Sequence, residues 1–308
     1  WAGPNRDFNI QNDGLAESWP QNGPPEIWKR ELGAGNSAIA AKSGYLYTIF
    51  RKLDSEGNPV DTETVVSLRA SDGETVWEFG YVSLKLEGQE FYKDDPGPHS
   101  TPLVLEDRVY TLGFAGQFHC LDRATGKLLW GRNLVDDFKA DKSLFGFVAG
   151  PLAYGDLVVI PASGEQCGLV AFDAISGDVV WKSPSASFSY ASPFVLNYQG
   201  RDYLVHHSRD RVDGIDPETG KRVWKYEHKK GQYPNVPTPV GLDGGQFMIS
   251  GQGITGVELI GLTVQGDTIQ PVKKWDNQKV WFFFGNAVVF GDYVYGGKEV
   301  YYSLNWKT

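Results

Sequence analysis

The residues of this chain whose types and spacing could do chemistry are few. His206-His207 is the one histidine doublet, Asp94-Asp95 and Asp136-Asp137 are carboxylate pairs, and Cys167 follows a glutamate and a glutamine. Neighbouring residues on a strand point to opposite faces, so the doublet would not converge on one metal ion. The acid pairs lack the glycine-spaced ligands of a calcium loop, and no histidine or lysine adjoins Cys167 to activate it. We therefore predict no catalytic residue and no metal ligand.

Composition limits the classes of function. The chain has 308 residues, of which 41% are hydrophobic and 22% charged, and no apolar run approaches a bilayer-spanning length. The formal charge of −9 comes without a basic stripe, which argues against nucleic acid as a partner. Cys120 and Cys167 allow either one disulfide or two buried thiols. The first residue is Trp1, so we expect that a leader was removed from an exported protein.

The element that must position any site is a hairpin unit that recurs four times. Each copy has an apolar strand end, a turn, a glycine, and a tryptophan four residues after the glycine. Glycine supplies the left-handed conformation that a short hairpin with a bulge requires. A fixed repeat of this kind indicates an array of similar supersecondary units. The copies lie at residues 68–77, 120–130, 172–181 and 215–224.

Each repeat also contains two earlier strands. Six segments open with a small polar or Gly/Pro triplet, at residues 36, 100, 149, 191, 237 and 285, and then become apolar. Small residues at the same point of every unit suggest strands crowded around a common axis. Second strands are expected at residues 45–50, 108–112, 157–160, 202–206, 246–250 and 292–295. With no long helical period, the pattern predicts an all-β fold, a β-propeller of four-stranded antiparallel blades with six blades counted.

The two ends of the chain are expected to meet. Residues 1–24 are predicted to form an extended N-terminal arm and residues 25–308 a single β-propeller domain. The last repeat stops short of its fourth strand, and residues 23–30 have the spacing of that strand. We expect this N-terminal strand to close the ring. The alternative is an incomplete seven- or eight-bladed propeller. An insertion at residues 51–64 is expected to form an exposed loop.

One tryptophan from each blade is expected to dock on the neighbouring blade. A buried indole of about 200 Å² contributes about 5 kcal/mol of gross apolar transfer, which would hold the blades together. The predicted docking residues are Trp28, Trp77, Trp130, Trp181, Trp224 and Trp275.

One face of the propeller is expected to carry the functional residues. Loops that lead into each blade share this face with the loops that join second and third strands. Aromatic walls with a few polar groups bind planar cofactors, sugars or partner side chains, although the same aromatics could pack between blades. The candidate ligand or partner face comprises His99, Phe145, Phe147, Tyr190, His207, Arg209, Asp210, Tyr233, Trp281, Phe283 and Lys298.

The unit Leu/Phe-Asp-x-x-Thr/Ser-Gly-Lys-x-x-Trp resembles the repeat of the pyrroloquinoline-quinone (PQQ)-type propellers, and residues 1–7 resemble the start of bacterial exported members. The resemblance implies the propeller fold and a periplasmic or extracellular location. The family contains quinoprotein alcohol dehydrogenases and non-catalytic members, such as the lipoprotein of the outer-membrane barrel-assembly machinery. Its enzymes carry an adjacent Cys-Cys pair and eight blades, and this sequence shows neither.

From these observations we expect a non-catalytic binding or scaffold module that contacts a partner protein or a carbohydrate such as a glycan. No cofactor, nucleic acid or membrane span is predicted. The alternative is a quinoprotein-type oxidoreductase that acts on an alcohol or a sugar, with PQQ and calcium as its cofactors.

Overall fold

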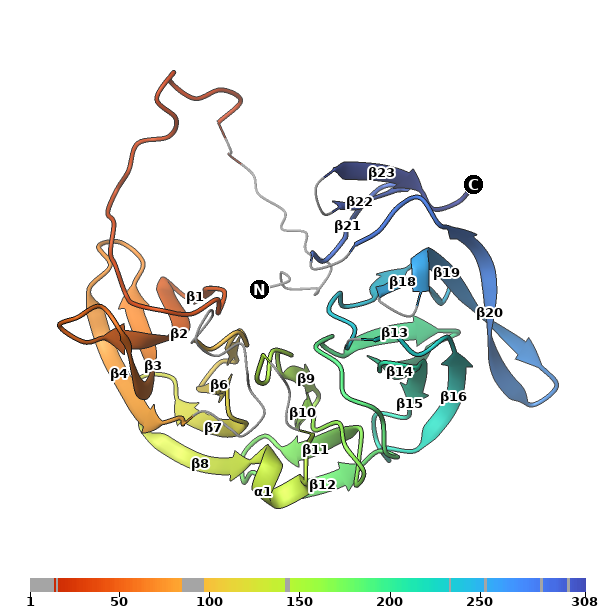
Figure 1. The fold of residues 1–308 in the computed structure, drawn as a ribbon, viewed down its shortest axis with the longest axis horizontal. Coiled ribbons are helices and arrows are strands. Elements are labelled where there is room, and N and C mark those ends of the chain that lie inside the picture. The colour runs from red at the N-terminus through yellow and green to blue at the C-terminus, as the bar shows by residue number, and fades with distance from the viewer. Residues whose placement is uncertain are drawn as a thin grey trace.

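The computed structural model describes residues 14, 16–84, 97–141, 145–232, 234–251, 254–282, 285–297 and 300–308. Within these residues, consecutive strands pair antiparallel in six sheets, which follow one another around a central axis as the blades of a propeller (Figure 1). In each blade the first strand lies nearest the axis and the last lies at the rim. The predicted propeller fold is confirmed.

The blades are numbered in chain order. Blade one holds β1 (Ala40–Lys42), β2 (Tyr45–Leu53), β3 (Pro59–Arg69) and β4 (Thr75–Val82). Blade two holds β5 (Leu103–Val104), β6 (Arg108–Leu112), β7 (Gln117–Asp122) and β8 (Leu128–Asn133), followed by α1 (Leu134–Phe138). Blade three holds β9 (Leu152–Tyr154), β10 (Leu157–Pro161), β11 (Leu169–Asp173) and β12 (Val179–Lys182).

Blade four holds β13 (Phe194–Tyr198), β14 (Arg201–His207), β15 (Arg211–Ile215) and β16 (Arg222–Glu227). Blade five holds β17 (Val240–Leu242), β18 (Gln246–Gly251), β19 (Ile254–Gln265) and β20 (Thr268–Asn277). Blade six holds β21 (Val288–Phe290), β22 (Tyr293–Gly297) and β23 (Tyr301–Asn305).

The recurrent hairpin has a simple physical basis. In blade two, Asp122 Oδ1 accepts hydrogen bonds from the backbone N–H of Thr125 at 2.8 Å and from its hydroxyl at 2.6 Å. Gly126 follows with φ of +72°, in the left-handed region that favours glycine. A Cβ atom on Gly126 would also lie 2.5 Å from the indole of Trp77. The glycine therefore serves both the turn and the close approach of the preceding blade.

Tryptophans join consecutive blades at the rim. The Trp77 indole N–H donates to Arg123 O at 2.9 Å, and the Trp181 indole N–H donates to Pro217 O at 3.0 Å. Trp130 and Trp275 make the same kind of bond, to Ala174 O at 3.4 Å and to Trp306 O at 3.1 Å.

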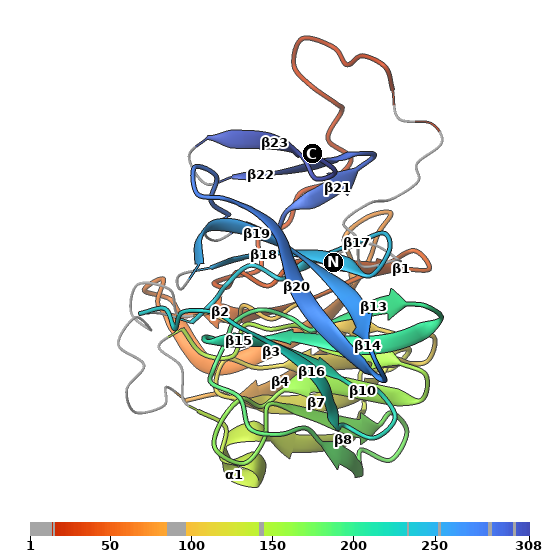
Figure 2. The ribbon, with the colours of Figure 1, turned by 90° about the vertical axis from the view of Figure 1, so that its right-hand side faces the viewer.

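Trp224 differs from the other docking tryptophans. Its indole is buried, but its N–H has no hydrogen-bond partner. The ring stacks on Phe247, with centroids 5.7 Å apart. Blade five lacks the Asp-x-x-Thr-Gly turn, and its long β19–β20 hairpin instead packs β20 against β16 of blade four (Figure 2).

The expected strand closure at the N-terminus is not present in the described residues. Blade six has three strands, and residues 23–30 pair with none of them. Trp28 nevertheless donates to Ala70 O of blade one at 2.9 Å, and Arg30 donates to Gly73 O at 2.7 Å. The segment thus docks on blade one as a last strand would, while Figure 1 shows it apart from β23.

The prediction of an exposed loop at residues 51–64 is wrong. β2 and β3 extend into it, and the side chains of Arg51 and Glu63 are fully buried as an ion pair of 3.0 Å. Glu63 also accepts from the Tyr81 hydroxyl at 2.7 Å, the Ser83 hydroxyl at 2.9 Å and the Phe114 N–H at 3.2 Å. Burial and the Glu63 charge hold the pKa of Tyr81 well above its usual value. These bonds satisfy the buried charge and join blades one and two.

Candidate functional site

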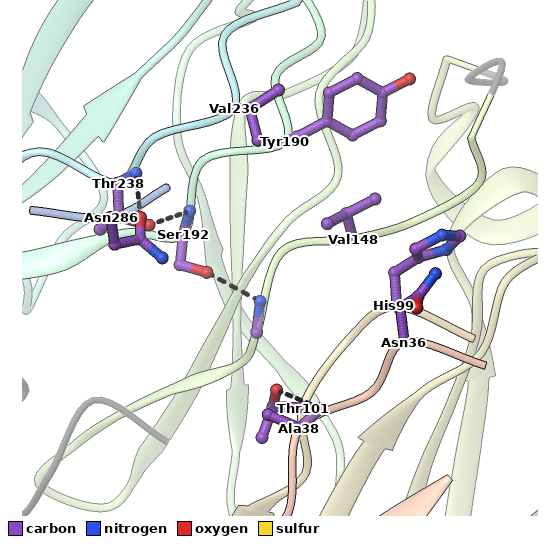
Figure 3. Close-up of a pocket in the computed structure, with 11 residues that line it drawn as sticks. Asn36, Ala38, His99, Thr101, Val148, Tyr190, Ser192, Val236, Thr238 and Asn286 are labelled. Atoms are coloured by element: carbon purple, nitrogen blue, oxygen red, sulfur yellow. Dashed lines mark hydrogen bonds between the residues drawn. The ribbon is translucent and has the colours of Figure 1, made fainter. Parts of the chain in front are cut away.

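A pocket of about 240 Å³ lies on the central axis, where the chain leads into the blades (Figure 3). Its lining residues stand two and four positions before the first strand of blades one to five, and two positions before that of blade six. Extended backbone brings alternate residues to one side, which explains this spacing. The lining residues are Asn36, Ala38, His99, Thr101, Val148, Gly150, Tyr190, Ser192, Val236, Thr238 and Asn286.

The residues two positions before each first strand form a hydrogen-bonded ring, which we call the axial ring. In each link a backbone N–H of one blade donates to a side-chain oxygen of the next blade. The links are Ala38 to Thr101 at 3.3 Å, Gly150 to Ser192 at 2.9 Å, Ser192 to Thr238 at 3.1 Å and Thr238 to Asn286 at 2.8 Å.

Two links of the axial ring are missing for a chemical reason. Gly150 and Ala38 have no side-chain oxygen. The backbone N–H of blade two therefore has no side-chain acceptor at Gly150 of blade three, and that of blade six has none at Ala38 of blade one. Blades two and three are joined one residue earlier, where the Ser100 hydroxyl donates to Ala149 O at 3.0 Å. The junction of blades six and one therefore lacks the ring link as well as the strand pairing.

The axial ring presents hydrogen-bond donors to the pocket. Each of the oxygens of Thr101, Ser192, Thr238 and Asn286 accepts one backbone N–H, and the hydroxyl hydrogens and the Asn286 amide nitrogen are the donors of this set. A ligand that is rich in acceptor oxygens would match this set. Figure 3 shows these side chains around the pocket, with His99 and Tyr190 at its wall.

The pocket is neutral in its described lining. No aspartate, glutamate, lysine or arginine lines it, and His99 is the only histidine. The described residues also contain no group of three or more His, Cys, Asp or Glu placed to hold a metal ion. The lining thus provides donors and apolar walls rather than charge.

The structure divides the predicted face into two parts. His99 and Tyr190 line the pocket, and Phe145 adjoins it, since its N–H donates to the Tyr190 hydroxyl at 3.3 Å. Phe147 packs in the hydrophobic core between blades two and three, and Trp281 is 43% exposed. Tyr233, Phe283 and Lys298 lie outside the described residues.

The other predicted residues lie on blade four, away from the pocket lining. His207 is fully buried beside His228. Arg209 donates to Gly231 O at 2.7 Å and also to Gln232 O, while Asp210 accepts from the Ser187 hydroxyl at 2.6 Å.

Sequence reasoning missed the functional potential of the axial ring, although its signal was present. The small triplet before each first strand predicts crowding at the axis, and the same triplets supply Thr101, Ser192, Thr238 and Asn286. Their role as donors depends on bonds between blades, which no single repeat displays.

The two cysteines are separate buried thiols. Burial raises the pKa of Cys120 to about 11 and also raises the pKa of Cys167. Neither thiol is poised as a nucleophile.

Fold and repeat together define a PQQ-like β-propeller. The chain belongs to the family described as outer membrane protein assembly factor BamB, whose profile matches residues 61–299. Helix α1 has five residues, and the described part of the chain has no helix with the length and hydrophobicity of a membrane span.

Curated relatives are enzymes. The chain is 28% identical over 181 residues to 1-butanol dehydrogenase (quinone) of Thauera butanivorans. The match covers 54% of this chain and 26% of the relative. It is 28% identical over 159 residues to the dehydrogenase subunit of alcohol dehydrogenase (quinone) of Gluconacetobacter polyoxogenes, 47% of this chain and 21% of the relative. The matched part thus spans about a quarter of these relatives or less.

A solved structure agrees in fold. Quinohemoprotein alcohol dehydrogenase of Comamonas testosteroni superposes with a TM-score of 0.51 at 13% identity, over 87% of this chain and 52% of that one.

Two predictions from the sequence are wrong in light of these relatives. The prediction of a non-catalytic binding or scaffold module is contradicted, because the relatives are named as quinone-dependent dehydrogenases and favour the oxidoreductase alternative. The prediction of no cofactor is overturned by the same finding, since enzymes of that name use a quinone.

Proposed function

We propose that this chain is the propeller of a quinone-dependent oxidoreductase that oxidises an alcohol, with the axial pocket as its ligand site. The observation that carries the proposal is the similarity of this propeller to curated quinone-dependent alcohol dehydrogenases. The pocket adds support, because it gathers donors from four blades at one point of the axis.

The donor set fits the quinone. PQQ is a planar ortho-quinone with three carboxylates, so its rim consists of acceptor oxygens. The residues that would hold this rim are Thr101, Ser192, Thr238 and Asn286, through their hydroxyl hydrogens and the Asn286 amide nitrogen. No carboxylate lines the described pocket, so we assign no calcium ligand.

The chain's own residues would bind and orient the alcohol and manage its proton. When bound, the quinone supplies the two-electron acceptor for alcohol oxidation. The alcohol hydroxyl must also lose a proton, and His99 is the histidine that lines the pocket, with imidazole nitrogens of the kind that serve as a general base. Val148 and Val236 form apolar walls that suit the carbon chain of a small alcohol.

The test measures binding and turnover separately. Protein treated with chelator is titrated with PQQ in the presence of calcium, and tryptophan fluorescence reports binding; dye reduction with 1-butanol reports activity. We expect saturable quenching and alcohol-dependent reduction. Asn286→Ala should weaken PQQ binding about tenfold, the equivalent of one hydrogen bond. Gln270→Ala, on the exposed strand β20, is the matched control. The absence of both quenching and dye reduction would refute the proposal.

An exported location is a further part of the proposal. It is supported by the family description, which names an outer membrane assembly factor. A protein partner has the same support, whereas the comparisons offer none for carbohydrate. Fractionation of cells that express the native gene tests the location: recovery in the cytoplasm alone would contradict it.

A further inference from the structure

Two histidines of blade four face each other outside the axial pocket. His207 stands at the end of β14 and His228 directly follows β16. Their Nε2 atoms are 3.2 Å apart, and their ring planes are inclined by 72°. Asn235 lies beside them, with its amide nitrogen 3.0 Å from His207 Nε2 and 2.7 Å from Ser208 O. The proposed oxidoreductase does not use this cluster.

Asn235 determines that His207 Nε2 carries no hydrogen. The carbonyl oxygen of Ser208 can only accept a hydrogen bond, so the amide group must turn its nitrogen toward this side. The second N–H of the same nitrogen then points to His207 Nε2. His207 Nε2 is therefore an acceptor without a hydrogen, and its single lone pair receives the Asn235 N–H.

His228 cannot satisfy both of its contacts as a neutral ring. Its Nδ1 lies 3.0 Å from Lys229 O, which only accepts, so Nδ1 carries a hydrogen. A neutral ring then leaves Nε2 without a hydrogen and 3.2 Å from the unprotonated Nε2 of His207. The other neutral tautomer turns a bare Nδ1 toward Lys229 O instead. Each neutral form leaves one repulsive contact, and a cation between the two Nε2 atoms removes it.

That cation is either a second proton on His228 or a metal ion. Burial, and to a lesser extent the neighbouring His228 and His206, hold the pKa of His207 well below its usual value. Burial also lowers the pKa of His228, although Lys229 O, Glu258 and Asp210 act in the opposite direction. A metal ion, in contrast, binds imidazole in its neutral form. The nearby carboxylates favour any cation held here.

We propose that His207 and His228 form a binding site for a divalent transition metal ion such as Zn²⁺, with their Nε2 atoms as ligands. With Zn–N distances of about 2.0–2.1 Å, the separation of 3.2 Å gives an N–Zn–N angle of about 100°, close to tetrahedral. The bond from His228 Nδ1 to Lys229 O is the outer contact that orients a ligating imidazole.

The rest of the site explains why two protein ligands suffice for binding. His228 is half-buried, so water can fill the remaining positions of the metal. Metal binding replaces the bond from Asn235 to His207, while Asn235 keeps its bond to Ser208 O. His206 takes no part, since the doublet points its rings apart and His206 Nε2 is buried elsewhere without a partner.

The experiment is calorimetric titration of tag-free, chelator-treated protein with Zn²⁺ at pH 7.5. One ion is expected per chain. His228→Gln should weaken binding at least about tenfold, since even outer contacts of a metal site cost that much. Asp136→Asn changes an exposed carboxylate on α1 and should bind as the wild type does. The unfolding midpoint of His228→Gln in chelator should match the wild type.

Two results would overturn the site. One is the absence of stoichiometric binding in the wild type, which would leave the pair as a hydrogen bond that takes up protons only. The other is binding that survives in His228→Gln. If that variant does not fold, X-ray absorption of the zinc-loaded wild type decides, because a spectrum without two imidazole nitrogens contradicts the assignment. None of these results depends on quinone binding.

Discussion

Two junctions between blades are built differently. Blades three and four are joined at two radii: near the axis by the bond from Gly150 N–H to the Ser192 hydroxyl, and at the rim by Trp181 on Pro217 O. Blades six and one have no ring link, because position 38 is alanine, and the rim of blade one is contacted by Trp28 of the N-terminal segment rather than by blade six. The comparison teaches that a propeller junction has an inner and an outer component, and that the outer one forms without strand pairing.

The largest expected effect is at the complete junction. Trp181→Ala removes a buried indole and should lower the free energy of unfolding by about 3–5 kcal/mol. Chemical denaturation measures the loss. Trp19→Ala, at a tryptophan that is 58% exposed, is the control and should change little. A loss below about 1 kcal/mol for Trp181→Ala would mean that the rim contact does not hold the blades.

The inner component of the same junction should contribute less. Ser192→Ala leaves the N–H of Gly150 without its acceptor in a buried position, and the expected loss is about 1–3 kcal/mol. Ser192→Thr keeps the hydroxyl and is the matched variant. Equal stability of the wild type and the alanine variant would show that water replaces the ring link.

At the incomplete junction the rim contact should be weaker. Trp28 is half-buried, so Trp28→Ala should cost about 1–2 kcal/mol, less than the change at Trp181. The same denaturation series measures it. A loss as large as that of Trp181→Ala would indicate that residues 23–30 complete blade six in solution.

The smallest effect expected is a gain. Ala38→Ser places a hydroxyl at the position where the pattern of the axial ring calls for an acceptor, and should add about 0.5–1 kcal/mol. Ala41→Ser, on the exposed side of β1, controls for the substitution itself. If the first variant gains nothing over the second, blade six lies too far from blade one for the link to form.

The sequence predicts those parts of the fold that depend on local patterns. The second strand at residues 108–112 agrees with β6 residue for residue, because apolar residues alternate between turn signals. The hairpins follow from the Asp-x-x-Thr-Gly turn. Burial of Arg51 and Glu63 was missed, since a polar stretch has the composition of a loop unless its partners in the next blade are known.

The candidate site is less predictable because its parts come from different blades. His99 and Tyr190 were predicted as loop residues of a ligand face and line the pocket, whereas Ser192 and Thr238 were interpreted as small residues at a crowded axis. The pairing of His207 with His228 joins two strand ends that are 21 residues apart, and no repeat pattern indicates it.

The glycines of the hairpins impose an order on assembly. Gly126, Gly177 and Gly220 each lie face to face with an indole of the preceding blade, at a distance that leaves no room for another atom. Each turn completes its packing only when the tryptophan of the preceding blade is in place. We therefore expect folding to propagate from one blade to the next around the propeller. Blade five offers Trp224 no such turn, and its N–H stays unpaired. Among the junctions that have a ring link, hydrogen exchange should accordingly find the earliest local opening between blades four and five.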